Sequence, residues 1–195
     1  MKKIIGITGG IGSGKSTVAH FITEKGFPVY NSDYWAKELV NLDSKLKEKI
    51  IQLLGNSSYD NLGNYNRKWV SEQVFGNDEL LKKLNQIIHP AVAEHFENWV
   101  KAQKSEWVFK ESALLYELGI YKNCYQTILV TADDNIRIKR VMDRDQKTYR
   151  EVEAVLQKQM PEKDKIKLAD HIIYNNSTLD EVEKETLRLL EKIQN

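Results

Sequence analysis

The 195-residue sequence has one cysteine, three prolines and no long hydrophobic run. A single cysteine, Cys124, excludes an intrachain disulfide, which fits a protein of the reducing cytosol. No apolar run approaches the roughly 18–20 residues that are needed to span a bilayer. The apolar stretch that follows Met1 is also too short for a signal peptide. We therefore expect a cytoplasmic protein with no membrane partner.

The sequence also lacks a large net charge of either sign. The sequence has 29 Lys and Arg residues against 28 Asp and Glu residues, which gives a net charge of +1 at pH 7. This balance argues against a nucleic-acid binder that works through a bulk basic surface. With 41% hydrophobic and 29% charged residues, the composition is that of an ordinary globular chain. Its length suits one domain with inserted lobes.

Short runs rich in β-branched or aromatic residues predict five strands. They lie at residues 3–8, 27–32, 107–110, 127–130 and 171–174, and helical periodicity fills much of the chain between them. The alternation of strands and helices predicts an α/β fold, with a mostly parallel sheet flanked by helices.

Two stretches between predicted strands are longer than a single crossover helix requires. Residues 34–104 contain several helical patterns, so we predict a helical lobe inserted into the core. A charged helical stretch at 145–165 precedes the fifth strand, and we expect it to form a mobile lid. The core then consists of residues 1–33, 105–144 and 166–195.

The strongest chemical signal is a glycine-rich loop directly after the first predicted strand. Residues 9–16 read Gly-Gly-Ile-Gly-Ser-Gly-Lys-Ser, which fits the phosphate-loop (P-loop) pattern G-x-x-x-x-G-K-[ST]. Glycines let successive N–H groups point at an anion, and the N-terminus of the following helix adds partial positive charge. The loop therefore predicts a site for the phosphates of a nucleotide.

Individual residues of this loop have distinct expected roles. Lys15 is expected to reach the β- and γ-phosphates, to be exposed, and to gain its partner only when nucleotide binds. The Ser16 hydroxyl is expected to ligate Mg²⁺. The residues expected to bind the nucleotide are Gly10, Ile11, Gly12, Ser13, Gly14, Lys15, Ser16 and Thr17.

A phosphate loop leaves the reaction class open. A GTPase switch is disfavoured because no [NT]-K-x-D tetrapeptide occurs, and the D-x-x-G match at 60–63 is more typical of a surface turn. A motor or transporter ATPase is disfavoured because no apolar strand ends in Asp-Glu. A small-molecule kinase needs a carboxylate near the acceptor hydroxyl and arginines near the transferred phosphoryl group. The sequence has candidates for both.

Two carboxylates end predicted strands, at the edge where an open parallel sheet binds its ligands. Asp33 ends the second strand and is expected to accept the proton of the attacking hydroxyl. The alternative interpretation is an N-cap for a helix that begins at Tyr34. Glu111 ends the third strand and is expected to hold Mg²⁺ through water. The alternative for Glu111 is a solvated acid at a strand end.

Three arginines follow the fourth predicted strand. Arg137, Arg140 and Arg144 are spaced by three and four residues, so they share one face of a helix. Like charges on one face repel each other unless anions lie among them, which indicates phosphate binding. A solvated surface stripe is the alternative interpretation.

With these motifs in place, the chain resembles the dephospho-coenzyme A kinase family along its whole length. The opening Gly6-Ile7-Thr8 and the phosphate loop are similar to the start of that family. Further motifs follow in the family's order: Asp33, Arg67 with Val74-Phe75, Ile88-His89-Pro90, Leu114-Leu115-Tyr116-Glu117, Arg140 with Arg144-Asp145, Gln159, and Ala169-Asp170 with Asn175.

This resemblance implies a P-loop kinase fold with a five-stranded parallel sheet, a CoA-binding lobe at 34–104 and the lid. It implies transfer of the ATP γ-phosphoryl group to the ribose 3′-hydroxyl of dephospho-CoA, giving CoA and ADP. ATP and dephospho-CoA are then the substrates and Mg²⁺ the cofactor. A monomer or small homo-oligomer with no nucleic-acid partner is expected. A nucleoside or nucleoside monophosphate kinase and a nucleotide-dependent binding module remain as alternatives.

The resemblance also assigns roles to residues. The implied catalytic residues are Asp33, Lys15 and Arg140. Arg144 and Asn175 join the nucleotide site, and Ser16 and Glu111 hold the metal. The implied substrate-binding residues are Asp33, Arg67, His89, Pro90, Leu114 and Glu117.

The sequence departs from the family's pattern at a few positions. Glu111 takes the place of an aspartate, and Leu156 stands where the lid often carries an arginine. Asn66 replaces an aspartate before Arg67, and Ala113 replaces a proline. With Leu156, no further arginine from the lid is expected at the phosphates.

Overall fold

The computed structural model describes residues 2–194 of the chain, and the chain divides into two compact units. Unit 1 is formed by Met1–Asn31 and Gln103–Asn195, and unit 2 by Ser32–Ala102. Unit 2 corresponds to the helical lobe predicted at 34–104, but it begins and ends two residues earlier than predicted. Residues 145–165, the predicted lid, belong to unit 1 in this division.

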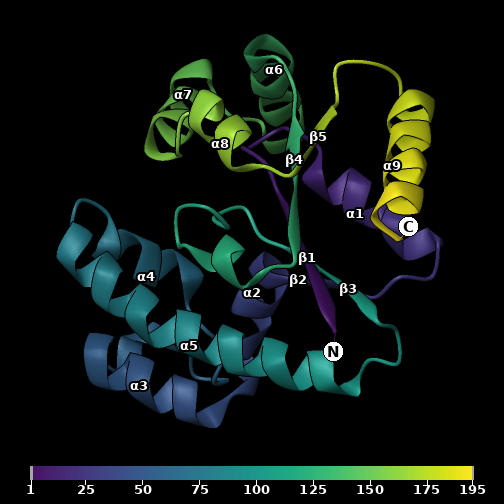
Figure 1. Cartoon of the computed structure of the whole chain (residues 1–195). Coiled ribbons are helices and arrows are strands. Elements are labelled where there is room, and N and C mark those ends of the chain that lie inside the picture. Colours follow the sequence, from purple (N-terminus) through teal and green to yellow (C-terminus); the bar gives the residue numbers. More distant parts are fainter. Residues whose placement is uncertain (1, 195) are drawn as a thin grey trace. The chain divides into compact units, whose positions relative to one another are not determined.

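Unit 1 is built on a parallel sheet with the strand order β2-β3-β1-β4-β5 (Figure 1). The strands are β1 (Lys3–Thr8), β2 (Val29–Asn31), β3 (Trp107–Glu111), β4 (Gln126–Thr131) and β5 (His171–Tyr174). The predicted α/β fold with five parallel strands is confirmed, and each predicted strand overlaps an observed one. All strands run in one direction, so their carboxyl ends meet at one edge, where such sheets bind ligands.

Helices connect these strands. The helix α1 (Lys15–Glu24) follows β1, and α9 (Leu179–Gln194) follows β5 and packs against α1. A short 3₁₀ turn, η2 (Ile120–Asn123), precedes β4. The connection from β4 to β5 contains α6 (Asp134–Asp145), α7 (Tyr149–Lys158) and α8 (Glu162–Leu168). The charged stretch predicted at 145–165 is therefore two helices, α7 and α8.

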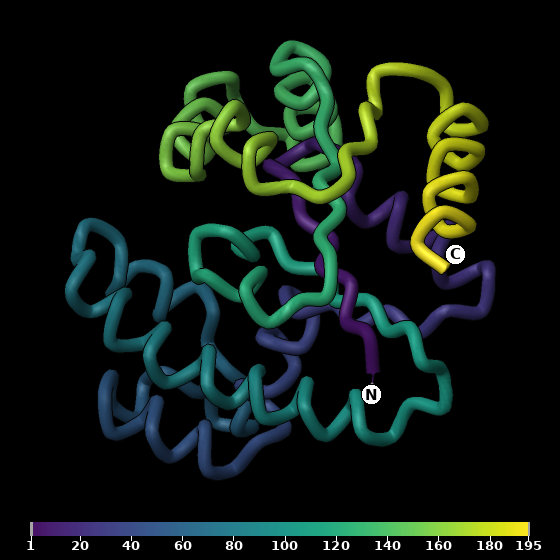
Figure 2. The backbone as a smooth tube through the Cα atoms, in the orientation of Figure 1, coloured from purple at the N-terminus to yellow at the C-terminus, as the bar shows by residue number. Residues whose placement is uncertain are grey.

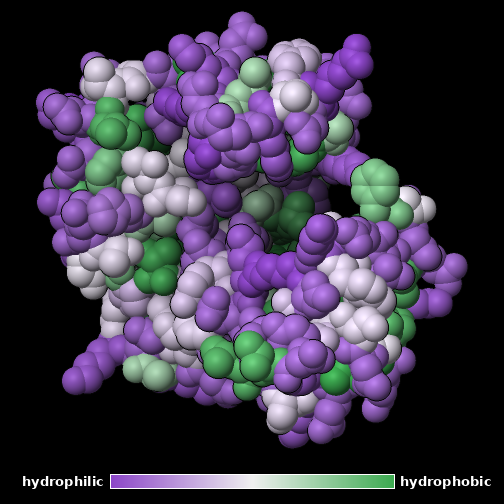
Figure 3. All heavy atoms as spheres, turned by 180° about the vertical axis from the view of Figure 1, so that it is seen from behind, coloured by the Kyte–Doolittle hydropathy of each residue, from purple (hydrophilic) through white to green (hydrophobic). Residues whose placement is uncertain are grey.

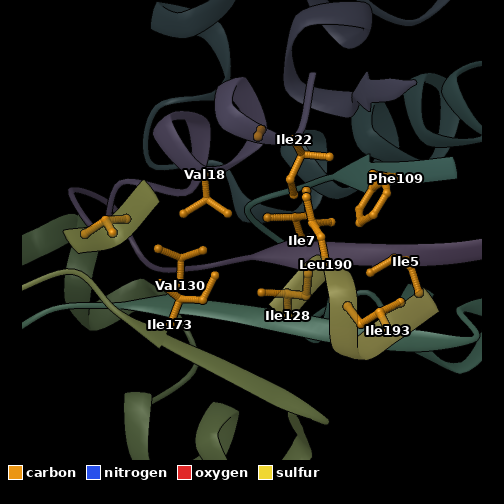
Figure 4. Close-up of a cluster of buried hydrophobic side chains, with 12 residues drawn as sticks. Ile5, Ile7, Val18, Ile22, Phe109, Ile128, Val130, Ile173, Leu190 and Ile193 are labelled. Carbon is orange, nitrogen blue, oxygen red and sulfur yellow. The ribbon is translucent and has the colours of Figure 1, made fainter. Parts of the chain in front are cut away.

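The core of unit 1 lies between the sheet and the helices α1 and α9 (Figure 4). Burying an aliphatic side chain of this kind contributes about 1.5–3 kcal/mol relative to exposure. The labelled core residues are Ile5, Ile7, Val18, Ile22, Phe109, Ile128, Val130, Ile173, Leu190 and Ile193. This packing holds the strand ends and the start of α1 in fixed positions, and the functional residues of unit 1 stand on those elements.

Unit 2 is one continuous segment of the chain that contains several helices, coloured from blue to teal in Figure 2. Its elements are α2 (Ser32–Leu42), α3 (Ser44–Leu54), η1 (Asn56–Ser58), α4 (Arg67–Val74) and α5 (Asp78–Ala102). The helices α2, α3 and α4 pack on the long helix α5. Leu39, Ile50 and Phe96 are among the residues buried there.

One interpretation from the sequence is settled within unit 2, and the position of His89 can be described there. The 60–63 match to D-x-x-G is a surface turn, because the Asp60 carboxylate accepts the N–H groups of Leu62 and Asn64, at 2.9 and 2.8 Å. The helix α5 runs through Pro90 without a break. His89 therefore lies in the interior of that helix.

The surface shown in Figure 3 is mostly hydrophilic, with hydrophobic side chains in small separate groups. Among residues 2–194, every helix is too short or too polar to cross a lipid bilayer.

Candidate active site

The phosphate loop connects β1 to α1 and leaves the start of that helix open. Gly14 is the N-cap residue, and no side chain of the described residues caps α1. Ser13 N donates to Gly10 O at 3.1 Å, which folds the loop back on itself, and the first i→i−4 bond of α1 runs from Val18 N to Gly14 O. Thr17 N–H also donates to Gly14 O, at 3.0 Å, and the first N–H groups of an α-helix have no i→i−4 acceptor. They form the kind of helix terminus that binds phosphate.

Two positions of the loop, Gly14 and Gly10, require glycine because another side chain lies where a Cβ atom would be. Gly14 has φ 91°, in the left-handed region, and a side chain there would collide with the Asn175 amide. A Cβ at Gly10 would lie 2.5 Å from Arg137 Nη2. The absence of side chains thus lets Asn175 and Arg137 approach the loop closely.

Asn175, directly after β5, bonds the backbone of the phosphate loop. Its Nδ2 donates to Ser13 O at 2.9 Å, and its Oδ1 accepts from Arg140 Nη2 at 3.2 Å. Its backbone N–H donates to Thr131 O at the end of β4. Asn175 is buried, so these bonds tie the loop, α6 and the edge of the sheet together.

Glu111, the last residue of β3, contacts three polar side chains. Its Oε1 accepts from Ser16 Oγ at 2.7 Å, and its Oε2 accepts from Asn31 Nδ2 at 2.7 Å. Lys15 Nζ lies 3.8 Å from Oε1. Only 3% of Glu111 is exposed, so the interpretation as a solvated acid is wrong. The three strands β2, β3 and β1 are neighbours in the sheet, which brings Asn31 and Glu111 to the start of α1.

The expectation that Lys15 is exposed and gains a partner only with nucleotide is also wrong. Its side chain is 19% exposed and lies within ion-pair distance of Glu111. The buried carboxylate needs a nearby cation to offset its loss of hydration, and Lys15 is placed to provide one.

The three arginines of α6 lie in different environments instead of forming one set. Arg137 is 3% exposed, and it donates from Nε to Ile11 O at 3.2 Å and from Nη1 to Glu162 Oε2 at 3.1 Å. Arg140 bonds Asn175. The Arg144 side chain is 65% exposed and pairs with Asp145 through two hydrogen bonds, which lower the pKa of the Asp145 carboxyl. The interpretation as a solvated stripe therefore holds for Arg144 and fails for Arg137.

The predicted residues of unit 2 have their own surroundings. The helix α2 begins at Ser32, so Asp33 lies inside its first turn and is not the N-cap of a helix that starts at Tyr34. Arg67 Nη2 donates to Lys37 O at 3.0 Å. Burial lowers the pKa of His89 from its ordinary value, which keeps this imidazole neutral at pH 7.

Leu114 and Glu117 follow β3 in unit 1 and are not equivalent to each other. Leu114 is exposed, whereas only 18% of the Glu117 side chain is exposed. Glu117 Oε1 accepts the Met160 N–H at 3.1 Å and lies 3.3 Å from Lys165 Nζ. The structure therefore joins Glu117 to Met160, between α7 and α8, and to Lys165 in α8.

Two residues that contact the loop site were missed as candidates. Asn31 ends β2, and a polar residue at the carboxyl end of a strand was the available signal. Arg137 was expected, with Arg140 and Arg144, to lie among phosphates on one helix face, but it was not assigned to the loop, although Gly10 and Gly12 leave room for a large side chain.

The side-chain oxygen atoms at the start of α1 are suitable ligands for Mg²⁺. Among the described residues, no cluster of three or more His, Cys, Asp or Glu side chains could hold a metal. Mg²⁺ does not need such a cluster, because it keeps several waters and uses one or two protein oxygens together with substrate phosphates. Ser16 Oγ and the Glu111 carboxylate, 2.7 Å apart, provide such oxygens.

Comparison with known proteins gives a consistent result over the whole chain. A sequence model described as dephospho-CoA kinase matches residues 3–181. The dephospho-CoA kinase of Fusobacterium nucleatum is 39% identical over 190 residues, which cover 97% of this chain and 98% of that protein.

Two solved structures agree with this result. A protein of Thermus thermophilus superposes with a TM-score of 0.86 at 33% identity, covering 98% of this chain and 97% of the other. The dephospho-CoA kinase of Campylobacter jejuni superposes with a TM-score of 0.74 at 28% identity, covering 99% and 98%. The chain therefore belongs to the dephospho-CoA kinase family, the ATP-dependent phosphotransferases of coenzyme A biosynthesis.

Proposed function

We propose that this chain, with Mg²⁺ as its cofactor, transfers the γ-phosphoryl group of ATP to the ribose 3′-hydroxyl of dephospho-CoA. The observation that carries the proposal is the uncapped start of α1, where Lys15, Ser16 and Glu111 converge. In phosphoryl transfer the protein mainly positions the reactants and stabilises charge that spreads over the phosphoryl oxygens. These residues are suited to both tasks.

The phosphates bind at the loop. The N–H groups of the first turn of α1 donate to them. Lys15 adds a positive charge, which lies 3.8 Å from the Glu111 carboxylate before the nucleotide binds. Ser16 and Glu111 hold Mg²⁺, which supplies charge neutralisation at the phosphate oxygens when bound. Asn31 keeps the Glu111 carboxylate in place through its 2.7 Å hydrogen bond.

Arg140 is the arginine whose surroundings best support a role at the transferred group. Its Nη2 bonds Asn175, whereas its buried Nη1 has no hydrogen-bond partner among residues 2–194. A buried donor without a partner costs about 1–3 kcal/mol, so an anionic oxygen at this position would remove that cost. Arg144 is already engaged with Asp145, and its assignment to the nucleotide site stays a prediction from the resemblance.

Asp33 is the proposed general base. It follows β2 by two residues in the chain and stands in the first turn of α2. Its carboxylate would orient the ribose hydroxyl and accept its proton as the bond to phosphorus forms. Arg67, His89 and Pro90 of unit 2, with Leu114 and Glu117 of unit 1, are the residues that the resemblance assigns to the acceptor.

The size of unit 2 favours a large acceptor. A bare ribose or a nucleoside needs few contacts, whereas the pantetheine arm and pyrophosphate of dephospho-CoA offer many. Binding energy from such remote groups can be used to position the reacting hydroxyl.

The test is ADP formation measured with ATP and each of dephospho-CoA, AMP and adenosine. Fast ADP release only with dephospho-CoA supports the proposal. AMP turnover at the same rate would identify a nucleoside monophosphate kinase, and acceptor-independent hydrolysis would identify a nucleotide-dependent binding module.

A further inference from the structure

Both backbone polar groups of one residue in the phosphate loop, Ile11, are bonded by side chains from outside the loop. Ile11 N–H donates to Gln159 Oε1 at 3.0 Å, and Ile11 C=O accepts from Arg137 Nε at 3.2 Å. Ile11 precedes Lys15 by four residues in the loop that would surround the phosphates. The peptide before Ile11 is therefore bonded by Gln159, the residue after α7, and the peptide after Ile11 is bonded by Arg137 of α6.

The backbone at Gln159 is arranged for this contact. The helix α7 ends at Lys158, and Gln159 is extended with φ −85° and ψ 155°. Pro161 disfavours helical backbone at Met160, directly after Gln159, so the helix does not continue beyond this point. The chain thus leaves the helix at Gln159, and the side chain is free to reach the loop.

A buried ion pair anchors the peptide next to Gln159. Met160 N–H donates to Glu117 Oε1 at 3.1 Å, and Lys165 Nζ lies 3.3 Å from the same oxygen. Lys165 is 0% exposed. Glu162, which comes three residues after Gln159, bonds Arg137 Nη1 at 3.1 Å. Segment 159–165 therefore bonds other parts of unit 1 at three points, which are Ile11, Glu117 and Arg137.

The Ile11 contact fixes the orientation of the Gln159 carboxamide. The partner is an N–H donor, so the carbonyl oxygen of Gln159 must face it. The Nε2 group then carries two N–H donors, and no described residue accepts from them. A glutamate at this position could accept the same Ile11 N–H, but it would bring a negative charge to the loop.

We propose that Gln159 is a positioning residue for the phosphates of ATP, a role that rests on the proposed function. Its Oε1 holds the Ile11 N–H, and so the Gly10–Ile11 peptide, in the orientation that the phosphate loop needs, and its Nε2 gives an uncharged donor beside the triphosphate. The Glu117–Lys165 pair keeps Gln159 within reach of the loop.

Three substitutions separate this role from a purely structural one. Gln159→Ala removes both functions of the carboxamide, Gln159→Met removes them while retaining most of the side-chain length, and Gln159→Glu retains the acceptor but adds a charge. Gln157, an exposed glutamine on α7, gives the matched controls Gln157→Ala and Gln157→Glu. ATP and ADP affinities are measured by titration calorimetry with Mg²⁺ and without acceptor, beside thermal unfolding.

We expect Gln159→Ala and Gln159→Met to weaken ATP binding about 3- to 10-fold, the effect of losing one or two neutral hydrogen bonds. Gln159→Glu should weaken it by about 10-fold or more, and more for ATP than for ADP, because ATP carries the additional phosphate charge. The Gln157 variants should bind as the wild type does. All variants should unfold within a few degrees of the wild type.

Wild-type ATP affinity in Gln159→Glu would overturn the proposal, because the charge would then lie away from the phosphates. Wild-type affinity in both Gln159→Ala and Gln159→Met would overturn it as well. The measurement contains no acceptor, so a chain that phosphorylated a different acceptor would refute the proposed function and leave this result standing.

Discussion

Ser16 Oγ donates a hydrogen bond to Glu111 Oε1 at 2.7 Å, although the two residues are 95 positions apart in the chain. The contact exists because β3 lies next to β1 in the parallel sheet, and because α1 begins where β1 ends. It couples the phosphate loop to Glu111, the carboxylate proposed above to hold Mg²⁺. Losing the Glu111 charge should therefore affect metal use first.

Glu111→Gln should raise the Mg²⁺ concentration that gives half-maximal activity by about 10- to 100-fold, in the range for groups that support a metal site. Glutamine retains an oxygen for Ser16 but cannot contribute a negative charge. The measurement is initial rate against free Mg²⁺ at saturating ATP. Glu106→Gln, at an exposed acid before β3, is the control and should leave the Mg²⁺ curve unchanged. An unchanged curve in Glu111→Gln would remove this residue from the metal site.

Lys15→Ala should lower kcat by roughly 10²–10³-fold, the usual effect of losing one group that stabilises transition-state charge. The fold should survive, because Glu111 retains Ser16 and Asn31 as partners. Steady-state kinetics and far-ultraviolet circular dichroism measure the two effects. Lys25→Ala, at the exposed end of α1, should retain wild-type activity. A kcat within twofold of wild type in Lys15→Ala would refute the role of the phosphate loop.

Asp33→Asn should lower kcat by about 10²–10⁴-fold while ATP affinity stays nearly constant, because a general base acts in the chemical step. Loss of a negative charge in the first turn of α2 should cost only about 0.3–1 kcal/mol of stability. Kinetics and urea unfolding give the two quantities. The control is Asp43→Asn at the N-cap of α3, where Asn caps about as well as Asp. If Asp33→Asn behaved like this control, the carboxylate would have only a helix-terminus role.

Asn175→Ala should reduce the free energy of unfolding by about 1–3 kcal/mol, because the buried Ser13 carbonyl loses its donor. It should also raise the KM for ATP, since both the loop and Arg140 lose a positioning contact. Urea unfolding and kinetics test this prediction. Asn176→Ala changes the neighbouring exposed residue and should have little effect. Equal stability of the two variants would mean that Asn175 does not support the loop.

Local sequence patterns predicted the strands and the phosphate loop well. The β-branched runs coincide with β1, β3, β4 and β5, because buried strands need such side chains on both faces of the sheet. The Gly14-Lys15-Ser16 step marks the start of α1 because only glycine fits the left-handed backbone at Gly14.

Long-range partners could not be predicted in the same way. The burial of Arg137 depends on Glu162, 25 residues later, and on space left by Gly10. A spacing of three and four residues shows only that arginines share a helix face, and says nothing about what covers that face. The Lys15–Glu111 pair likewise depends on the strand order, which local patterns do not fix.

The most direct test of the account is analysis of the product formed from ATP and dephospho-CoA. We predict CoA, with the new phosphate on the ribose 3′-oxygen as located by phosphorus-coupled nuclear magnetic resonance. AMP and adenosine should be poorer acceptors by at least about 10²-fold in kcat/KM, roughly 2.7 kcal/mol of transition-state stabilisation. AMP converted to ADP as efficiently as dephospho-CoA is phosphorylated, or phosphate found on another oxygen, would contradict the account.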